Sequence, residues 1–543
     1  MFDIVIWLLL VVLSGAVAYQ RVLAYLRYFQ QEGYEHVRFL RWANVRSFTD
    51  PLFWAAVLSA FLFFVAPWTA VALFFVSSLT LAALQPDPRR SGKIPLRLTA
   101  RATRTFVVAV SVAVAFWTAL VSAFALTAGF QAAMTATAMM LAAMPIVVVA
   151  ANALLLPYER FVQHRFEREA VDRVRDVHPI VIGITGSYGK SSSKSMLAHL
   201  LQFDAPTLAA TGSINTLMGI TRHIREALVP GHKYMVVEMG AFSTGSIRRL
   251  CQLTPPSAGL ITAVGDMHLE RFGSHDAIVT AKGELADAIP AGGILVVNAD
   301  SPGALKIARR STHLKVLLYG EQSTESLATR IEGITFSKEG THFTLRTETR
   351  AYACFTPLLG RPIVMNLAGA FTLAVALGAN PEVAVAALRT LKPVSNRLEV
   401  VDDAGVTWIR DAYNSNQFGF RAALEVAVAL PAVRRVLVTP GVIELGAQQF
   451  DVNRALSREA SAVCDQTLVV AVTNREAYIA GHRDAGREPR LVPVENRAAA
   501  FAWIKAHVQP GDLVILENDL PDLYERTAGL FWREPASPKA SRG

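Results

Sequence analysis

The chain has 543 residues, of which 52% are hydrophobic, and its mean hydropathy of +0.33 is high for a soluble protein. This length suggests about three or four domains. The formal charge of +9 at pH 7 does not by itself indicate a nucleic-acid partner, since the excess can sit beside membrane segments. Cys251, Cys354 and Cys464 lie far apart and form no CxxC pattern. Their spacing argues against a zinc site and a disulfide framework and fits a reducing compartment.

Residues 1–157 have the composition of a membrane region with about five spans. A signal peptide is the competing interpretation of the first apolar run. However, no basic residue precedes that run, and Arg21 and Arg27 follow it, which favours an anchor whose N-terminus lies outside. The predicted spans are Ile4–Ala18, two short ones within Pro51–Leu84 that are separated at Pro67-Trp68, Thr105–Leu126, and Ala132–Leu156.

Two groups of basic residues fix the expected orientation of these spans. Arg21 to Arg46 and Arg89 to Arg104 fall on the same side as everything after Leu156, and the positive-inside rule makes that side the cytoplasm. We therefore expect a multi-pass protein of the cytoplasmic (inner) membrane with its remaining domains in the cytoplasm. The spans contain no charged side chain, so ion transport has no residue to use. They are either an anchor or a holder for a lipid-linked substrate.

The rest of the chain predicts two α/β domains after a charged, helix-compatible connector at 158–178, which we expect to present a solvated face. β-branched runs alternate with helix-length segments, which indicates mainly parallel sheets. The expected domains are 179–390 and 391–534, followed by a disordered tail at 535–543. Predicted strands are Ile180–Thr185, Tyr234–Glu238, Ala258–Thr262 and Gly293–Asn298 in the first domain, and Trp408–Arg410, Arg435–Thr439, Gln466–Val472 and Leu513–Leu516 in the second. Lys315–Phe355 predicts a small side sheet, and Asn366–Leu377 predicts a helix.

A glycine-rich segment follows the first of these strands. Gly186-Ser187-Tyr188-Gly189-Lys190-Ser191-Ser192 precedes a helical pattern, so its backbone N–H groups are expected to form an anion site at a helix N-terminus. Lys190 would reach the outer phosphates of a nucleotide and Ser191 would bind Mg²⁺. The spacing departs from the commonest phosphate loop, and a bare GxxGKS also occurs in ordinary turns. Its position between a strand and a helix favours phosphate binding.

Polar residues near the ends of later strands are candidates for the same site, because active groups collect at the carboxyl ends of parallel strands. Glu238 ends an apolar run and suits Mg²⁺, although a lone Glu there is more often a surface residue. His268 taken alone fits a loop histidine, and Lys282 taken alone fits a solvated helix face. Arg397 precedes the second domain and could stabilise charge on a transferred phosphoryl group.

Ten motifs that follow one another along the chain together resemble a known family, although none of them does so alone. The segments are Gly183–Ser191, Thr211–Thr216, Val237–Gly240, His268–Gly273, Ala281–Glu284, Asn298–Asp300, Leu359-Gly360 with Asn366, Asn396–Glu399, Asp411–Asn416 and Glu444–Gly446. Together they resemble the Mur ligase family of ATP-dependent amide-bond-forming enzymes over about residues 179–530. The similarity is greatest to the branch that adds D-alanyl-D-alanine to the muramyl tripeptide.

The resemblance implies a P-loop central domain, a Rossmann-like C-terminal domain, and ATP and Mg²⁺ as cofactors. It implies that the loop from Gly186 to Ser192 holds the phosphates and that Ser191, Glu238, His268 and Lys282 hold metal. Lys282 matches a lysine that family members carry as a carbamate, and Asn366 matches an adenine-side contact. Arg397 and Asp411 match residues that close on the phosphates and ribose. Lys190, His268, Lys282, Arg397 and Asp411 are accordingly the expected catalytic set.

Four departures qualify the resemblance. Membrane segments stand where this branch has a soluble domain for the UDP part of its substrate. Pro362 and Ile363 replace the usual His-Asn before Asn366. Arg410-Asp411 replaces a double Asp. Glu517-Asn518-Asp519 replaces a Lys-Gly-Ser motif near the incoming amino acid, which could favour a cationic amine.

The sequence therefore predicts a membrane-anchored ligase that acts through an acyl phosphate in cell-wall peptide synthesis. Its partners would be a UDP-, lipid- or polymer-linked carboxylate, an amino acid or dipeptide amine, and the lipid bilayer, with no nucleic acid. Two alternatives remain: a polymer ligase resembling poly-γ-glutamate synthase, and a nucleotide-binding membrane scaffold without ligase activity.

Overall fold

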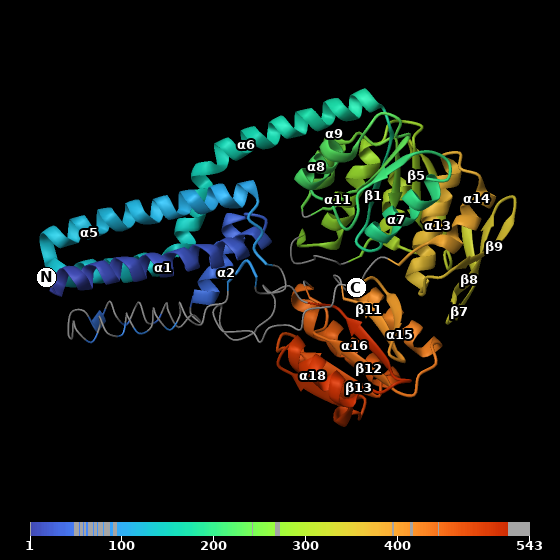
Figure 1. The fold of residues 1–543 in the computed structure, drawn as a ribbon. Coiled ribbons are helices and arrows are strands. Elements are labelled where there is room, and N and C mark those ends of the chain that lie inside the picture. The colour runs from blue at the N-terminus through green and yellow to red at the C-terminus, as the bar shows by residue number, and fades with distance from the viewer. Residues whose placement is uncertain are drawn as a thin grey trace. The chain divides into compact units, whose positions relative to one another are not determined.

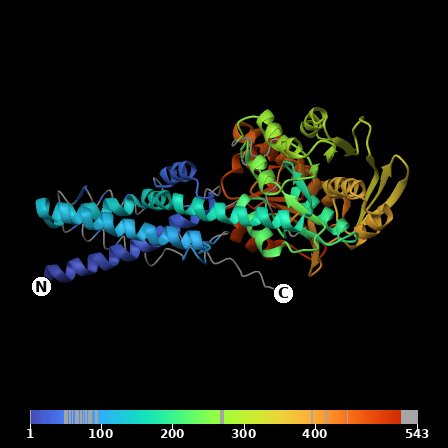
Figure 2. The same ribbon diagram turned by 90° about the horizontal axis from the view of Figure 1, so that it is seen from above.

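The computed structural model describes residues 2–47, 87–90, 95–241, 243–265, 272–393, 396–412, 416–443 and 445–519, with isolated positions between 54 and 80. The chain divides into two compact units (Figures 1 and 2). Among the described residues, unit 1 lies within 2–162 and unit 2 comprises Gln163–Asp519. The tail predicted to be disordered lies outside the described residues.

Unit 1 is built from long helices. They are α1 (Phe2–Gln31), α2 (His36–Ser47), α5 (Ala100–Ala142) and the first part of α6 (Met144–Val177). Their shared core contains Leu26 and Phe29 from α1, Phe39 from α2, Ala109 from α5 and Val148 from α6. The two short spans predicted within Pro51–Leu84 lie almost wholly outside the described residues.

The chain reverses direction within α5. Trp117 Nε1 donates to Thr137 Oγ1 at 2.9 Å, whereas a straight helix would separate residues 20 apart by about 30 Å. The pair Arg101–Asn152 (3.2 Å) has the register of the same antiparallel match, and Arg104–Glu159 (2.7 Å) is a further contact between α5 and α6. The reversal between Trp117 and Thr137 agrees with the predicted turn between Thr105–Leu126 and Ala132–Leu156.

By length and composition, two helical stretches in the described residues could cross a membrane. They are Ala100–Ala119 and Met144–Val177. These features alone are weak evidence for a transmembrane region, and the count of about five spans stays a prediction.

The charged connector has the solvated face that its sequence predicts and, in addition, a buried apolar stripe. Residues 158–177 form the second part of α6, which continues through Pro157. Ala170 and Val174 are buried against Ile224 and Leu250 in unit 2, and Arg173 Nε donates to the carbonyl of Leu228 at 2.7 Å. The sequence of alternating charges therefore did not reveal this narrow apolar stripe, which packs on α8 and α9 within unit 2.

The first domain of unit 2 contains, among the described residues, a nine-stranded sheet in the order β2-β3-β1-β4-β5-β6-β7-β8-β9. Its strands are β1 (Ile180–Thr185), β2 (Thr207–Ala209), β3 (Tyr234–Glu238), β4 (Ala258–Ile261), β5 (Ile294–Asn298), β6 (Lys315–Gly320), β7 (Thr329–Ser337), β8 (Gly340–Thr347) and β9 (Ala351–Thr356). The strands up to β7 pair in parallel. The segment predicted to be a separate side sheet instead extends this sheet through antiparallel β7, β8 and β9.

Helices cover both faces of this sheet because its strands carry apolar residues on alternate sides. Ile182 and Ile184 face a core shared with α7 and α13, whereas Val181 faces one shared with α8, α9 and α11. The helices are α7 (Lys190–Leu201), α8 (Leu217–Ala227), α9 (Ser246–Leu253), α11 (His275–Ala288), α12 (Pro302–Arg310), α13 (Arg361–Ala376) and α14 (Pro381–Ala387).

The second domain has, in the part of the chain that is described, a six-stranded sheet in the order β10-β11-β15-β12-β13-β14. Its strands are β10 (Glu399–Asp403), β11 (Val406–Asp411), β12 (Arg435–Thr439), β13 (Gln466–Val470), β14 (Leu491–Val494) and β15 (Leu513–Glu517), and only β10 pairs antiparallel. The helices are α15 (Gln417–Ala429), α16 (Gln449–Val463), α17 (Arg475–Asp484) and α18 (Arg497–His507).

Candidate nucleotide site

The glycine-rich loop joins β1 to α7 in a form that only glycine permits at two positions. A Cβ on Gly186 would lie 2.0 Å from Thr262 Oγ1, and a Cβ on Gly189 would lie 2.3 Å from Asn366 Oδ1. Gly189 is the N-cap of α7 with a left-handed φ of 79°. Ser187 Oγ donates to the carbonyl of Gly265 at 2.8 Å. These contacts hold the loop against the end of β4 and leave the N-terminus of α7 in the geometry that suits anion binding.

Lys190 begins α7, and its side chain folds back over the loop. Nζ donates to the carbonyls of Gly186 (2.9 Å) and Ser187 (3.1 Å). Burial lowers the pKa of Lys190 to about 8, the charge of Arg397 also lowers it, and Glu238 opposes both. Lys190 thus lies where the resemblance expects a phosphate-binding lysine.

Arg397 extends to the start of α7 from the segment that joins the two domains. Its Nη2 donates to Ser191 Oγ at 3.4 Å and to Ser213 Oγ at 3.5 Å, and these hydroxyls are 3.1 Å apart. Ser192, the next residue of the loop, is also buried. The structure therefore brings the predicted residue Arg397 to Ser191, which lies 206 positions earlier in the chain, beside Ser192.

Glu238 is buried at the end of β3 and is held by two partners. Asn215 Nδ2 donates to Oε1 at 2.9 Å, and Lys194 Nζ donates to Oε2 at 3.4 Å. Lys194 and Glu238 are each 1% exposed, and burial lowers the pKa of Lys194. The sequence analysis did not identify Lys194. Its position one helical turn after Lys190, between buried Ser193 and Met196, was the available signal.

Lys282 is buried on α11 and makes no hydrogen bond or ion pair with any described residue. Burial, followed by the charge of Lys190, lowers its pKa well below the ordinary value. It is therefore not the solvated lysine that its helical position alone would suggest. Its neighbour Glu284 accepts from the backbone N–H groups of Gly245 and Arg248, at the N-terminus of α9, and so has a structural role.

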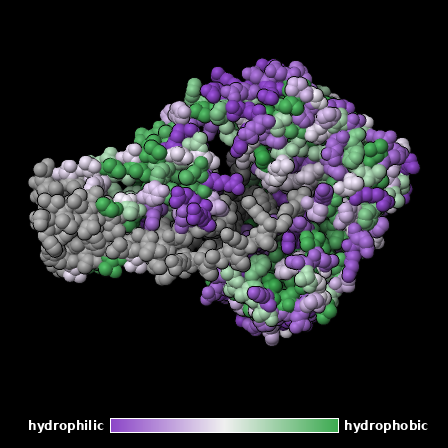
Figure 3. Space-filling model, in the orientation of Figure 1, coloured by the Kyte–Doolittle hydropathy of each residue, from purple (hydrophilic) through white to green (hydrophobic). Residues whose placement is uncertain are grey.

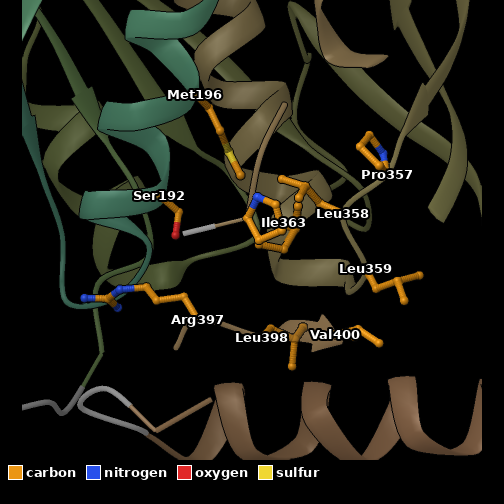
Figure 4. Close-up of a pocket in the computed structure, with 10 residues that line it drawn as sticks. Ser192, Met196, Pro357, Leu358, Leu359, Ile363, Arg397, Leu398 and Val400 are labelled. Atoms are coloured by element: carbon orange, nitrogen blue, oxygen red, sulfur yellow. The ribbon is translucent and has the colours of Figure 1, made fainter. Parts of the chain in front are cut away.

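Asn366 lies on α13 against Gly189, so it adjoins the phosphate loop directly. A small pocket lies near the start of α7, with Ser192 and Met196 on one wall (Figure 4). The opposite walls come from the chain after β9 and from the segment that joins the two domains. The lining residues are Ser192, Met196, Pro357, Leu358, Leu359, Ile363, Pro393, Arg397, Leu398 and Val400.

Asp411 ends β11 in the second domain, beside Glu517 at the end of β15. Its Oδ1 accepts from the backbone N–H of Leu398 at 3.1 Å. Burial raises the pKa of Asp411 to about 6, while the Leu398 hydrogen bond and the charge of Arg397 oppose the shift. Arg397 and Leu398 therefore connect the phosphate loop of one domain to the strand end of the other.

His268 lies outside the described residues, as do Tyr413, Asn414 and Glu444 from the sequence motifs. Among the described residues, no group of three or more His, Cys, Asp and Glu side chains could hold a metal ion. Ser191 and Glu238 still offer the oxygen donors that Mg²⁺ prefers. These oxygen donors suit Mg²⁺ chemically, and the assignment of Ser191, Glu238, His268 and Lys282 to a metal stays a prediction.

The comparisons with known proteins agree with this geometry. Residues 184–374 match the family model of the Mur ligase middle domain, and residues 396–517 match that of the Mur ligase, glutamate ligase domain. A UDP-N-acetylmuramoyl-tripeptide–D-alanyl-D-alanine ligase of Mycobacterium tuberculosis is 31% identical over 362 residues, which span 62% of this chain and 70% of the relative. The Bacillus subtilis protein of that name is 30% identical over 359 residues, or 64% and 76% of the two chains.

A solved structure shows that the similarity also holds for the three-dimensional fold. The crystal structure of MurF from Acinetobacter baumannii superposes with a TM-score of 0.59 at 25% identity, covering 66% of this chain and 77% of that one. The phosphate loop, the buried Glu238 and the joining segment with Arg397 all lie inside the matched regions. The chain therefore belongs to the Mur ligase family and is an ATP-dependent acid–amino-acid ligase of the Mur type.

Proposed function

We propose that this ligase is MurF-like: it adds an amino acid or dipeptide amine to a carboxylate of a peptidoglycan precursor while anchored in the cytoplasmic membrane. The observation that carries the proposal is the concentration of cationic groups, buried or half-buried, beside the N-terminus of α7. Lys194 pairs with Glu238, Lys190 lies near Glu238 and Lys282, and Arg397 reaches in from the second domain. Such a site can bind two anions next to each other, a carboxylate and a nucleoside triphosphate.

The proposed reaction has two steps. A carboxylate oxygen of the acceptor attacks the γ-phosphorus of ATP, the bond to the β-phosphate oxygen breaks, and ADP leaves. The amine nitrogen then attacks the acyl carbon, phosphate leaves, and the nitrogen loses a proton. Lys190 and the loop N–H groups would bind the phosphates, and Arg397 would stabilise the charge of the transferred group. Mg²⁺ held by Ser191 and Glu238 would neutralise phosphate charge.

Exposed apolar side chains on unit 1 support the membrane anchor. Only 22% and 33% of the most apolar windows of Ala100–Ala119 and Met144–Val177 are buried, so these helices differ from the buried core helices of soluble proteins. Ile146, Leu154 and Phe161 share one side of α6 and are at least 62% exposed. Figure 3 shows hydrophobic residues on the described surface of unit 1. A lipid bilayer would cover such a surface.

A membrane anchor bears on the acceptor. The membrane region stands where similar ligases have a domain for the UDP part of the substrate, so a lipid-linked carboxylate is favoured over a soluble one. Basic residues at the bundle end, such as Arg101 and Arg104, are typical of the cytoplasmic side. The catalytic domains would accordingly act in the cytoplasm.

The test uses the full chain purified in detergent with ATP and Mg²⁺. We expect phosphate release only when a carboxylate acceptor and an amine are both present, and a product with one mass increment. A ladder of increments would contradict the single-step reaction and indicate a polymer ligase. If UDP-, lipid- and polymer-linked acceptors all give no turnover, ligase function is contradicted, and the nucleotide-binding membrane scaffold is the remaining alternative. The membrane assignment has its own test, because release of the protein from membranes by alkaline carbonate would contradict it.

A further inference from the structure

One side of helix α15 in the second domain contacts the first domain at two places. Phe418 and Glu425 are seven positions apart and therefore lie on the same side of this helix. The ring of Phe418 packs against Tyr188 of the phosphate loop, with 5.3 Å between the ring centroids. Two turns further along, Glu425 Oε1 accepts from Nε and Nη2 of Arg361, each at 3.2 Å. Helix α15 thus contacts both the phosphate loop and the start of α13.

The backbone of the first domain comes close to the second domain beside this ion pair. Gly360, which precedes Arg361, has a left-handed φ of 112°, and a Cβ there would lie 2.2 Å from Leu398 Cδ2 and 3.7 Å from Val426 Cγ2. Leu359 belongs to the same apolar core as Leu398 and α15. The contact with α13 and α15 therefore also fixes the backbone that carries the neighbouring Arg397.

Arg361 is shared between carboxylates of the two domains. Its Nη1 donates to Glu321 Oε1, which follows β6 in the first domain, whereas Nε and Nη2 donate to Glu425. The side chains of Glu321, Arg361 and Glu425 are 20%, 36% and 38% exposed. A guanidinium has five donors in a fixed fork and can bind both carboxylates at once. Glu321 therefore orients Arg361, and Glu425 is the carboxylate that the second domain supplies.

We propose that Glu425 is a positioning residue: its ion pair with Arg361 holds the second domain where Arg397 reaches Ser191. Domains within one chain ordinarily move relative to each other unless their interface is large and apolar. Arg397 Nη2 lies 3.4 Å from Ser191 Oγ, and a shift of about 1 Å at a reacting group can cost a hundredfold in rate. The proposal rests on the role proposed above for Arg397 in phosphoryl transfer.

Loss of this ion pair should lower catalysis more than nucleotide binding. Lys190 and the N–H groups of the phosphate loop belong to the first domain, so they bind phosphate wherever the second domain lies. Arg397 reaches the same place only when α15 is docked. Glu425 therefore affects the step that uses Arg397 and leaves the affinity for ADP unchanged.

The first experiment measures docking directly. Glu425→Arg replaces the attraction to Arg361 with repulsion. Spin labels on Lys315→Cys in the first domain and Val433→Cys, 83% exposed in the second, report the distance between the domains in the detergent-purified full chain. The three natural cysteines are buried. The population outside the docked distance should rise by about fivefold, and an unchanged distance distribution would overturn the proposal.

The second experiment tests whether opposite charges restore the function. In the phosphate-release assay of the full chain, Glu425→Arg should lower kcat by about tenfold. The dissociation constant of ADP with Mg²⁺, measured by isothermal titration, should not change. Adding Arg361→Glu to Glu425→Arg restores an attractive pair and should recover most of the lost kcat. A weakened ADP affinity, or no recovery in the double variant, would overturn the proposal.

A second ion pair on α15 provides the matched control. Arg421 Nε donates to Glu459 Oε2 at 2.8 Å within the second domain, and these side chains are 42% and 36% exposed. Glu459→Arg therefore makes the same change at similar exposure without touching the first domain. Its distance distribution and kcat should match those of the unaltered chain. Losses equal to those of Glu425→Arg would overturn the proposal.

Arg397→Ala distinguishes failure of this proposal from failure of the function on which it rests. If Arg397→Ala lowers turnover and Glu425→Arg does not, the positioning role of Glu425 alone is overturned. If Arg397→Ala keeps full turnover, the role proposed for Arg397 fails instead. If the unaltered chain shows no turnover with any acceptor, the proposed function fails, and the distance measurement still decides whether Glu425 docks the second domain.

Discussion

The carboxyl edges of the two sheets in unit 2 are built alike but carry opposite charge. At the edge of the first sheet, Lys194 pairs with the buried carboxylate of Glu238, Lys190 lies near both Glu238 and Lys282, and Glu284 acts on Lys282. At the edge of the second, Asp411 and Glu517 end neighbouring strands β11 and β15. Burial shifts the pKa of the lysines down and that of Asp411 up. At both edges the fold therefore holds ionisable groups away from water, which destabilises their charged forms.

The difference shows that the carboxyl edge of a mainly parallel sheet can serve either to bind phosphate or to orient a cation. A cationic edge that begins a helix is suited to phosphate, whereas an acidic edge can orient a cation such as the guanidinium of Arg397. The link between them is short, since Arg397 contacts Ser191 and the next residue, Leu398, donates to Asp411. Substitutions at the two edges should therefore differ in size and in kind.

The largest effect is expected at the cationic edge. Lys190→Ala removes the ammonium group at the loop, so ATP turnover should fall by about a thousandfold or more. Phosphate release by the full chain with acceptor and amine measures this effect. Lys315→Ala on the exposed face of β6 is the control and should retain full turnover. Undiminished turnover in Lys190→Ala would refute the assignment of the loop.

The second effect tests the buried ion pair at the same edge. Lys194→Met leaves Glu238 without its cationic partner in a fully buried position, which should cost about 3–5 kcal/mol of unfolding free energy. Urea unfolding of unit 2 within the full chain measures the loss. Glu238→Gln in the same chain should restore part of it, because the unpaired charge is then absent.

A surface pair provides the control for Lys194. Lys233 and Asp204 are 2.7 Å apart with 47% and 28% of their side chains exposed, so Lys233→Met should cost less than about 1 kcal/mol. Equal losses in the two variants would mean that burial of the Lys194–Glu238 pair does not determine its contribution.

The sequence predicted where the strands end better than it predicted which residues pack against those ends. Tyr234–Glu238 and Arg435–Thr439 have the predicted bounds because β-branched runs end sharply at polar residues. Lys194 was missed, since a lysine on an amphipathic helix is ordinarily solvated and only tertiary packing shows that it is buried. Similarly, Lys315–Phe355 was predicted as a small side sheet. Alternation indicates strands, but it does not reveal that the first of these strands, β6, pairs with β5.

The smallest effect is expected at the acidic edge and depends on pH. Asp411 has an ordinary pKa of about 3.9 in the unfolded chain and one of about 6 when folded. Between these values the folded protein binds a proton that the unfolded chain does not. Its stability therefore falls as the pH rises from about 4 to 6, and the loss persists above 6.

Asp411→Asn isolates this contribution. The amide oxygen still accepts from Leu398, but the side chain cannot ionise, so the variant should gain at most about 3 kcal/mol over the unaltered chain at pH 7. The gain should vanish toward pH 4. Urea unfolding at several pH values measures it, with Asp403→Asn on exposed β10 as the control. A gain that does not change with pH would show that Asp411 is not the titrating group, and the acidic edge would then lack the strain found at the cationic one.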